Sequence, residues 1–393
     1  MKAKWVIFAV LTAFFVLIVH SGSEAVNTRD IDTVRNKPVL DSTDLQIIDD
    51  FLDEAVRELV NTKDFTSIAQ TRSTILARNS SRKSSAQAQY AEQFSESAHK
   101  YISEGLKQAE QLTPEDRRFK VILNLLILID GLEDVRLAEL SIGLLKDENT
   151  VIRYWAVHSV TSPGFTKQLN ASIATNPQLA RRIVEQLKGL VERSRPEILA
   201  LVAEFAAEVG IPEGEDLLGQ IADMRIKRYA DWTVDYELLD ADILRLLYQK
   251  IYSEGLSKSQ PSAGRYKPAV ARRFGQLYSY VIQRYVKGRD VLNADQKQQL
   301  ASVLVETEKS FISKLLGMPQ SVIKGAVERD DYTRLLLEHS KLLGDETGTG
   351  RLALKLNFDY GKNLNGTART APLALPVRKD SQGEPPKKLI TDN

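Results

Sequence analysis

Apolar residues recur at steps of three and four along most of the chain, the spacing that places them on one face of an α-helix. The pattern is clear over residues 45–59, 90–106 and 270–285. Over residues 121–129 nearly every position is apolar, as is typical of a helix enclosed by other helices. The hydrophobic pattern therefore predicts an all-α fold.

Residues with helix-starting chemistry mark several expected helix ends. Thr113 followed by Pro114 predicts a helix with a hydroxyl cap and a proline at its first position. Asn293 is expected to cap a long helix, and Pro319 to open a shorter one. The last helix is expected over residues 332–343.

The stretch LLKDENTVIRYWAVHSV, residues 144–160, joins two apolar segments through a short polar turn. A helix expected over residues 133–146 stops at residues 147–150, where polar side chains can cap the next helix. Two helices joined by so short a turn lie antiparallel. The spacing returns at steps of about 46 residues: Ile152 corresponds to Ile198, and a further step reaches the segment LLDADILRLLYQKIY.

Asp147 in this turn, followed by Val151 and Arg153 at the start of the second helix, resembles the inter-helix turn of HEAT repeats, with Ile152 inserted between the last two. The resemblance covers roughly residues 115–255, with one well-formed unit and two divergent ones. It implies antiparallel helix pairs stacked as a HEAT-like or armadillo-like α-solenoid, whose concave face suits binding. It implies an architecture and no particular reaction.

Changes in composition divide the chain into six parts. The segment SEGLSKSQPSAGRYKP is small, polar and rich in turn formers, so a linker is expected there. Residues 352–358 alternate in polarity and are compatible with a lone strand, and Pro, Lys, Asp and Gly dominate from residue 367. The expected parts are a signal peptide (1–25), an N-terminal helical region (26–112), HEAT-like repeats (113–255), a linker (256–268), a C-terminal helical region (269–344) and a largely disordered tail (345–393).

The first residues have the pattern of a secretory signal peptide. Lys2 and Lys4 precede an uncharged apolar run over residues 5–19, and small residues at Ser23 and Ala25 suit a signal peptidase. The apolar run is short for a spanning helix, which needs about 20 residues. We therefore expect export to a periplasmic or extracellular location with cleavage near Ala25. The alternative is an uncleaved N-terminal anchor.

Charge and cysteine content narrow the classes of partner and chemistry. Removal of residues 1–25 takes away two lysines and one glutamate, leaving 51 basic and 51 acidic residues. A net charge of zero provides no general attraction for nucleic acid or anionic membranes. The chain has no cysteine, which excludes disulfides, thiolate metal sites and thiol nucleophiles.

No motif in the sequence identifies a reaction. The chain has four histidines and lacks the HExxH, GxSxG and GxxxxGK[ST] motifs. His339 is interpreted as a residue near a helix end, favoured there by the helix dipole. Asp240 and Asp242 resemble half of a metal site but suit a helix N-terminus equally well. We therefore name no catalytic residue, no metal ligand and no cofactor.

Two segments qualify as candidate interaction surfaces because they combine aromatic and basic side chains. One is RIKRYADWTVDYELL, and the other is KPAVARRFGQLYSYVIQRYVKGR, whose aromatic residues also fall on a buried stripe. The candidate residues are Tyr229, Trp232, Tyr236, Arg272, Arg273, Arg284 and Lys287.

Together these features predict an exported, non-enzymatic protein-binding or scaffolding α-solenoid whose partner is another protein. An exported hydrolase or lyase, with a site built from scattered acids and arginines, is the alternative from another class. If residues 5–19 are retained, the protein is instead an anchored envelope component that contacts the membrane.

Overall fold

The computed structural model describes residues 28–79, 88–251, 267–363 and 366–378. The predicted signal peptide, most of the predicted linker and residues 379–393 lie outside these residues. The described part of the chain is mostly helical, with one short two-stranded hairpin, which confirms the all-α prediction. It divides into two compact units, residues 1–140 and residues 141–393. None of the described helices is both long enough and apolar enough to cross a membrane.

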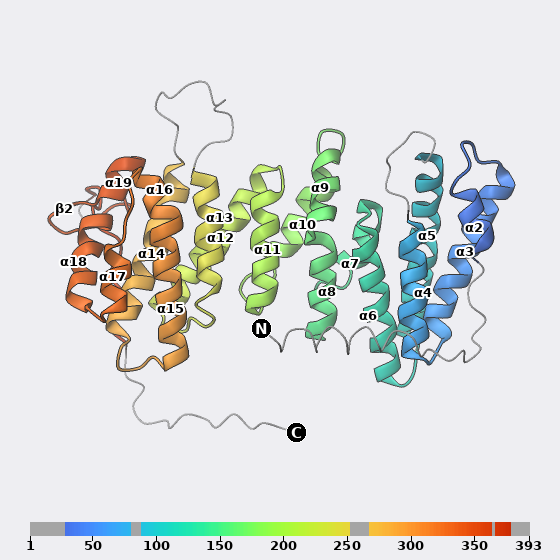
Figure 1. The fold of residues 1–393 in the computed structure, drawn as a ribbon, viewed down its shortest axis with the longest axis horizontal. Helices are drawn as coiled ribbons and strands as arrows, with labels where there is room; N and C mark the ends of the chain where they lie inside the picture. The colour runs from blue at the N-terminus through green and yellow to red at the C-terminus, as the bar shows by residue number, and fades with distance from the viewer. Residues whose placement is uncertain (1–27, 80–87, 252–266, 364–365, 379–393) are drawn as a thin grey trace, which may run out of the picture. The chain divides into compact units, whose positions relative to one another are not determined.

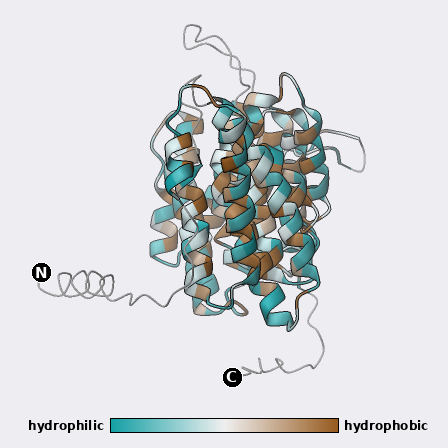
Figure 2. Cartoon of the chain, turned by 90° about the vertical axis from the view of Figure 1, so that its right-hand side faces the viewer, coloured by the Kyte–Doolittle hydropathy of each residue, from teal (hydrophilic) through white to brown (hydrophobic). Residues whose placement is uncertain are grey.

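The N-terminal unit is a set of helices packed on their neighbours (Figure 1). Helix α3 packs against α4 and α5, and α6 packs against all three. Figure 2 shows apolar and polar stripes on these helices, as expected where one face of a helix is buried. The elements are α2 (Arg29–Val34), α3 (Ser42–Asn61), α4 (Phe65–Arg78), α5 (Ala88–Glu110), α6 (Glu115–Leu132), η2 (Val135–Leu137) and α7 (Ala138–Ile142), in which the unit ends.

Helix α6 contains the segment that was predicted to be enclosed. Most of residues 121–129 are buried, which confirms that prediction. Its start differs by one position: Pro114 is the residue that precedes the helix, after a cis peptide bond, and no side chain caps the first turn. The negative charges of Glu115 and Asp116 in that turn interact favourably with the positive end of the helix dipole.

The C-terminal unit contains two parallel series of neighbouring helices. Contacts run from α8 to α11, α13 and α15, and from α10 to α12, α14 and α18, while α11–α12 and α13–α14 pack across the series. This two-layer packing is compatible with an α-solenoid. The elements are α8 (Thr150–Thr161), α9 (Pro163–Ser172), α10 (Gln178–Lys188), α11 (Pro196–Glu208), α12 (Pro212–Ala230), α13 (Leu239–Ile251), α14 (Pro268–Lys287), α15 (Ala294–Thr307), the π-helical turn η3 (Glu308–Ile312), α16 (Ser313–Leu316), α17 (Val322–Glu328), α18 (Tyr332–Leu343), β1 (Gly344–Asp345), β2 (Gly348–Thr349) and α19 (Arg351–Leu356).

The helix predicted over residues 133–146 is not continuous. Glu133 ends α6 in the left-handed conformation, and the Asp134 side chain accepts from the Arg136 N–H to begin η2. The polar turn after it behaves as predicted. Asn149 caps α8 by accepting from the N–H groups of Val151 and Ile152, at 2.9 and 3.4 Å.

The start of α17 also differs from its prediction, because a buried carboxylate determines it. The Glu308 side chain accepts from the N–H groups of Ile323 and Lys324, each at 2.8 Å. These are orphan donors of the first turn of α17. The helix therefore begins at Val322, and Pro319 lies in the preceding connection.

The C-terminal region has more structure than was predicted. Residues 351–356 form α19, in place of a strand, and bury Leu352, Ala353 and Leu356. Residues 358–360 and 373–375 then contact α14, where the sequence suggested a largely disordered tail. Gly275 allows this close approach, since a Cβ there would lie 2.9 Å from the Tyr360 hydroxyl oxygen.

Replacing the cap of α8 tests the role of the polar turn. Asn149→Ala leaves the first N–H groups of α8 without their side-chain acceptor, so the free energy of unfolding should fall by about 1 kcal/mol. Urea unfolding followed by the fluorescence of Trp155, which lies within α8, measures the change. Glu148→Ala, one residue earlier in the same turn, should have little effect. Equal losses in the two variants would contradict the capping role of Asn149.

Candidate functional site

The aromatic cluster after α12 and the basic end of α14 meet in the C-terminal unit. The guanidinium carbon of Arg284 lies 5.9 Å from the centre of the Tyr229 ring and 5.6 Å from that of Trp232. Both distances allow a cation–π interaction. Tyr229 is fully buried, whereas Trp232 is partly exposed. Arg284, on one predicted interaction segment, therefore contacts Tyr229 and Trp232 on the other.

A buried ion pair fixes the loop between α12 and α13 that carries Trp232. Arg225 donates two hydrogen bonds to the Asp240 carboxylate, at 2.8 and 2.9 Å, and both side chains are inaccessible to solvent. The Tyr229 hydroxyl donates to the same carboxylate at 2.6 Å. Burial raises the pKa of Tyr229 well above its usual value, and the Asp240 charge raises it further. Asp240 is thus committed to Arg225 and Tyr229 rather than to a metal, and the described residues contain no cluster of metal-ligating side chains.

A second buried pair holds the loop against α14. Arg284 Nη2 lies 3.3 Å from Glu237 Oε1 and 3.4 Å from the Val234 carbonyl oxygen. Trp232 and Tyr236, in this loop, have φ angles of 58° and 52°. The left-handed conformation costs a non-glycine residue about 1 kcal/mol or more. The two ion pairs stabilise the loop in spite of that cost.

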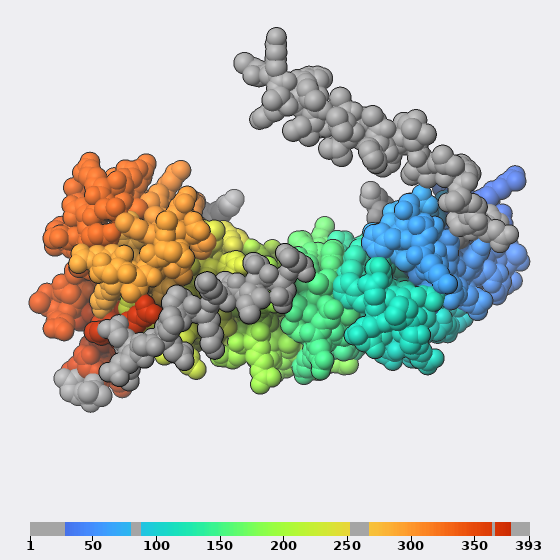
Figure 3. Space-filling model, turned by 90° about the horizontal axis from the view of Figure 1, so that it is seen from below, coloured from blue at the N-terminus to red at the C-terminus, as the bar shows by residue number. Residues whose placement is uncertain are grey.

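The described end of the chain lies extended along α14. Gln276 and Gln283 are seven residues apart and Lys287 a further four, so all three project from one face of the helix. Each donates to a main-chain carbonyl of residues 373–375. Figure 3 shows this end of the chain, in red, against the orange atoms of the α14–α15 region. We call this face of α14, with Trp232, the tail groove.

In the described part of the tail, main-chain atoms make every hydrogen bond to these four side chains. Gln276 exchanges two with Leu373, at 3.2 and 2.7 Å. Gln283 donates to the Leu373 carbonyl at 3.1 Å and accepts from the Leu375 N–H at 2.7 Å. Lys287 donates to the Leu375 carbonyl at 2.8 Å. The Trp232 indole donates to the Pro376 carbonyl at 2.9 Å.

The side chains of the tail contribute unequally to this contact. Leu375 is 2% exposed and supplies the apolar anchor, whereas Val377 is 87% exposed. Pro372 is also buried. The groove thus holds the tail through its main chain and through one buried aliphatic side chain, that of Leu375.

A neutral histidine supports the glutamine at the centre of the groove. Gln283 donates to the Ser279 hydroxyl at 2.8 Å, and Ser279 lies 2.8 Å from His339 Nε2. Burial lowers the pKa of His339 to about 4, and the nearby Lys287 charge lowers it further, against the opposite effect of Asp345. His339 precedes the last turn of α18, and its lowered pKa leaves the ring without a positive charge for the helix dipole to favour at pH 7.

The structure brings together four of the seven candidate residues. Tyr229, Trp232, Arg284 and Lys287 lie at the tail groove. Tyr236 is in the same loop, with its side chain 57% exposed. Arg272 binds Asp359, and Arg273 binds Asp223 through two hydrogen bonds of 2.9 Å. These two arginines therefore fasten α14 to other parts of the unit.

The two glutamines and the tail were missed in the sequence. Gln276, Ser279 and Gln283 interrupt the apolar stripe of residues 270–285, and this was a usable signal. Their main-chain partners lie 90 to 97 residues away in the chain. Periodicity within a helix contains no information on such a partner.

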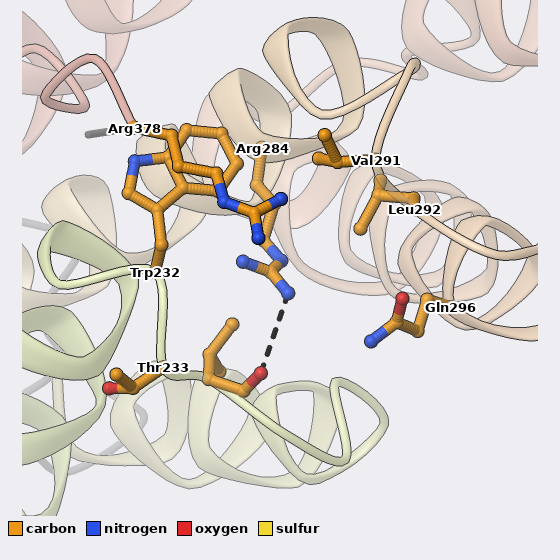
Figure 4. A pocket seen from close by; sticks show the side chains of 8 residues that line it. Trp232, Thr233, Arg284, Val291, Leu292, Gln296 and Arg378 are labelled. Carbon is orange, nitrogen blue, oxygen red and sulfur yellow. Dashed lines mark hydrogen bonds between the residues drawn. The ribbon is translucent and has the colours of Figure 1, made fainter. Parts of the chain in front are cut away.

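A cavity of about 320 Å³ opens where the tail groove ends. Figure 4 shows the guanidinium groups of Arg284 and Arg378 directed into the same space beside Trp232. Gln296 from α15 faces them, and Val291 and Leu292 form an apolar wall. The cavity can therefore accept a group that continues from a chain in the groove.

Comparison with known proteins adds no relative. No protein-family model matches the chain, and no curated protein sequence matches it closely enough to show a relationship. The fold defines the class of all-α proteins built from helices packed against their neighbours.

The lowered pKa of His339 predicts a pH dependence of stability. The folded protein binds this proton less readily than the unfolded chain, so stability falls as pH drops from about 6.5 towards 4. His339→Gln retains a polar partner for Ser279 but cannot titrate. Between pH 7.5 and pH 5 the wild type should lose about 1 to 2 kcal/mol more than this variant. Urea unfolding at both pH values measures the difference, and parallel losses would contradict a neutral buried His339.

Proposed function

We propose that this protein is an exported, non-enzymatic protein-binding α-solenoid that holds an extended segment of a partner protein in the tail groove. The observation that carries the proposal is the set of hydrogen bonds from α14 and Trp232 to the main chain of residues 373–376. Any extended polypeptide presents the same alternating N–H and C=O groups. The groove is therefore chemically suited to chains other than its own tail.

The geometry defines what a partner segment must provide. The positions of Leu373 and Leu375 donate their N–H groups to glutamine side chains, so proline is excluded there. Proline is compatible with the neighbouring positions, as Pro372 and Pro376 show. The position of Leu375 requires an aliphatic side chain because it is buried. The partner class is therefore an extended segment with one aliphatic residue at the position of Leu375 and no proline at the two donor positions.

The tail acts in this proposal as a resident occupant that a partner replaces. Each hydrogen bond contributes a net of about 1 kcal/mol, because water replaces the lost partner when the tail leaves. Attachment to the same chain keeps the tail at a high effective concentration, about millimolar for a short link. A successful partner must therefore fit the groove better than the tail does.

The finer architecture proposed is a solenoid of HEAT-type repeats over roughly residues 115–255. The packing of α11 against α8, α12 and α13, together with the Asn149 cap, supports it. Arg153 adds support, since its Nη1 donates to the carbonyls of Asp147 and Glu148, at 2.6 and 2.9 Å. This arginine thereby ties the second helix of the best unit to its turn.

Export rests on residues 1–25 and has a direct test. Intact-mass measurement of the natively expressed protein, in soluble and membrane fractions separately, should give a chain that begins near Val26. A full-length chain in the membrane fraction would contradict cleavage and favour the anchored alternative.

Peptide binding in trans tests the groove. The full-length variant Leu373→Pro/Leu375→Pro lacks the two N–H donors of the tail, and hydrogen exchange of residues 371–378 should show that the tail is released. Fluorescence polarisation should then show saturable binding of a labelled, C-terminally amidated Ala-Pro-Leu-Ala-Leu-Pro-Val-Arg peptide. Adding Gln283→Ala should weaken binding about tenfold, because two hydrogen bonds are lost.

The matched control is Gln298→Ala, a glutamine at an exposed position of α15, which should leave peptide binding unchanged. A released tail and a folded protein without saturable peptide binding would contradict the proposed function. Binding that is insensitive to Gln283→Ala would place the peptide elsewhere on the surface.

A further inference from the structure

The tail places an arginine against another arginine at the end of the tail groove. Arg284 and Arg378 both line the 320 Å³ cavity, and their guanidinium groups are directed into the same space (Figure 4). Arg378 is exposed and forms no ion pair with a described residue. Two like charges that share a cavity disfavour each other. The tail thus fits the groove well up to Pro376 and poorly at Arg378.

Arg284 has unused capacity for an anion. Its side chain is 6% exposed, and its one carboxylate partner among the described residues is Glu237, at 3.3 Å. Within the described part of the chain, Nη1 has no hydrogen-bond acceptor, and Nε is buried without one. A guanidinium group has five N–H donors. The existing contacts satisfy few of them.

The surroundings of Arg284 favour an ion pair over a solvated contact. The cation lies over the rings of Tyr229 and Trp232, and Leu292 and Val291 line the other side of the cavity. An ion pair in such a partly desolvated place is screened less than one on an open surface. Gln296 adds an amide that can donate to an incoming oxygen.

We propose that the partner segment carries an acidic residue, aspartate or glutamate, at the position of Arg378, three residues after the buried aliphatic residue. This inference rests on the proposed function and defines the partner further. The carboxylate pairs with Arg284 in the cavity and replaces the like-charge contact made by the tail. The tail then fits the groove less well than a matching acidic segment, and such a segment displaces it.

Three amidated peptides test the proposal on the full-length Leu373→Pro/Leu375→Pro protein. The first has the sequence of residues 371–378, and the second carries Arg378→Glu. The third is a positional isomer of the second, with glutamate at the position of Val377 and valine at that of Arg378. Amidation matters because a free C-terminal carboxylate would itself approach Arg284. The second and third peptides have the same composition and charge, so their difference isolates the contact in the cavity.

We expect the Arg378→Glu peptide to bind about tenfold more tightly than the positional isomer, the value for one well-placed charged contact. Because the cavity is partly desolvated, raising the salt concentration should leave most of that ratio in place. The ratio should fall to about one in a receptor that also carries Arg284→Gln and Glu237→Gln, a pair of changes that leaves no unpaired buried charge. Circular dichroism checks that this receptor is folded; if it is not, the comparison of the second and third peptides on the first receptor decides between the outcomes.

The outcomes separate the two proposals. Equal binding of the second and third peptides overturns the acidic preference and leaves peptide binding in the groove intact. A tenfold preference that persists after both changes at Arg284 and Glu237 also overturns it, because the carboxylate would then bind elsewhere. Failure of all three peptides to bind overturns the proposed function and this inference together.

Discussion

The C-terminal unit depends on one constraint: helix α14 is buried around most of its circumference and yet carries polar side chains. Gln276, Ser279, Gln283 and Arg284 are all buried, and a buried polar group without a partner costs about 1 to 3 kcal/mol. Their partners come from three other elements: the tail for both glutamines, His339 of α18 for Ser279, and Glu237 in the loop before α13 for Arg284. Satisfying α14 therefore fixes the position of three other segments.

The fold was largely predictable because helix formation is encoded locally. Periodicity over residues 121–129 and 270–285 identified buried helices, and the polar turn at Asn149 was recognised from its capping chemistry. The errors have tertiary causes. Glu308 determines where α17 begins from 15 residues away, and residues 352–356 become a helix because three of them are buried. Neither effect leaves a trace in a short window of sequence.

The candidate site was predictable only in its cationic and aromatic half. The combination of arginines and aromatic residues predicted Arg284 and Trp232 as interaction residues, and the structure places them in contact. The glutamines lack such a signature, because a polar residue on a helix is normally read as solvent-facing. Their partners are main-chain atoms, which every residue has, so the residue types of the tail could not reveal them either.

The nature of the tail groove follows from the weakness of each of its contacts. A hydrogen bond that water can replace contributes little net free energy, so several are needed to hold the tail, and none prevents its release. Leu375 is the one large side chain of residues 373–378 that is fully buried. Covalent attachment adds a high effective concentration of the tail, which a separate partner lacks. In the proposed function, a partner would gain its advantage where the tail fits worst, in the cavity that Arg284 and Arg378 both line.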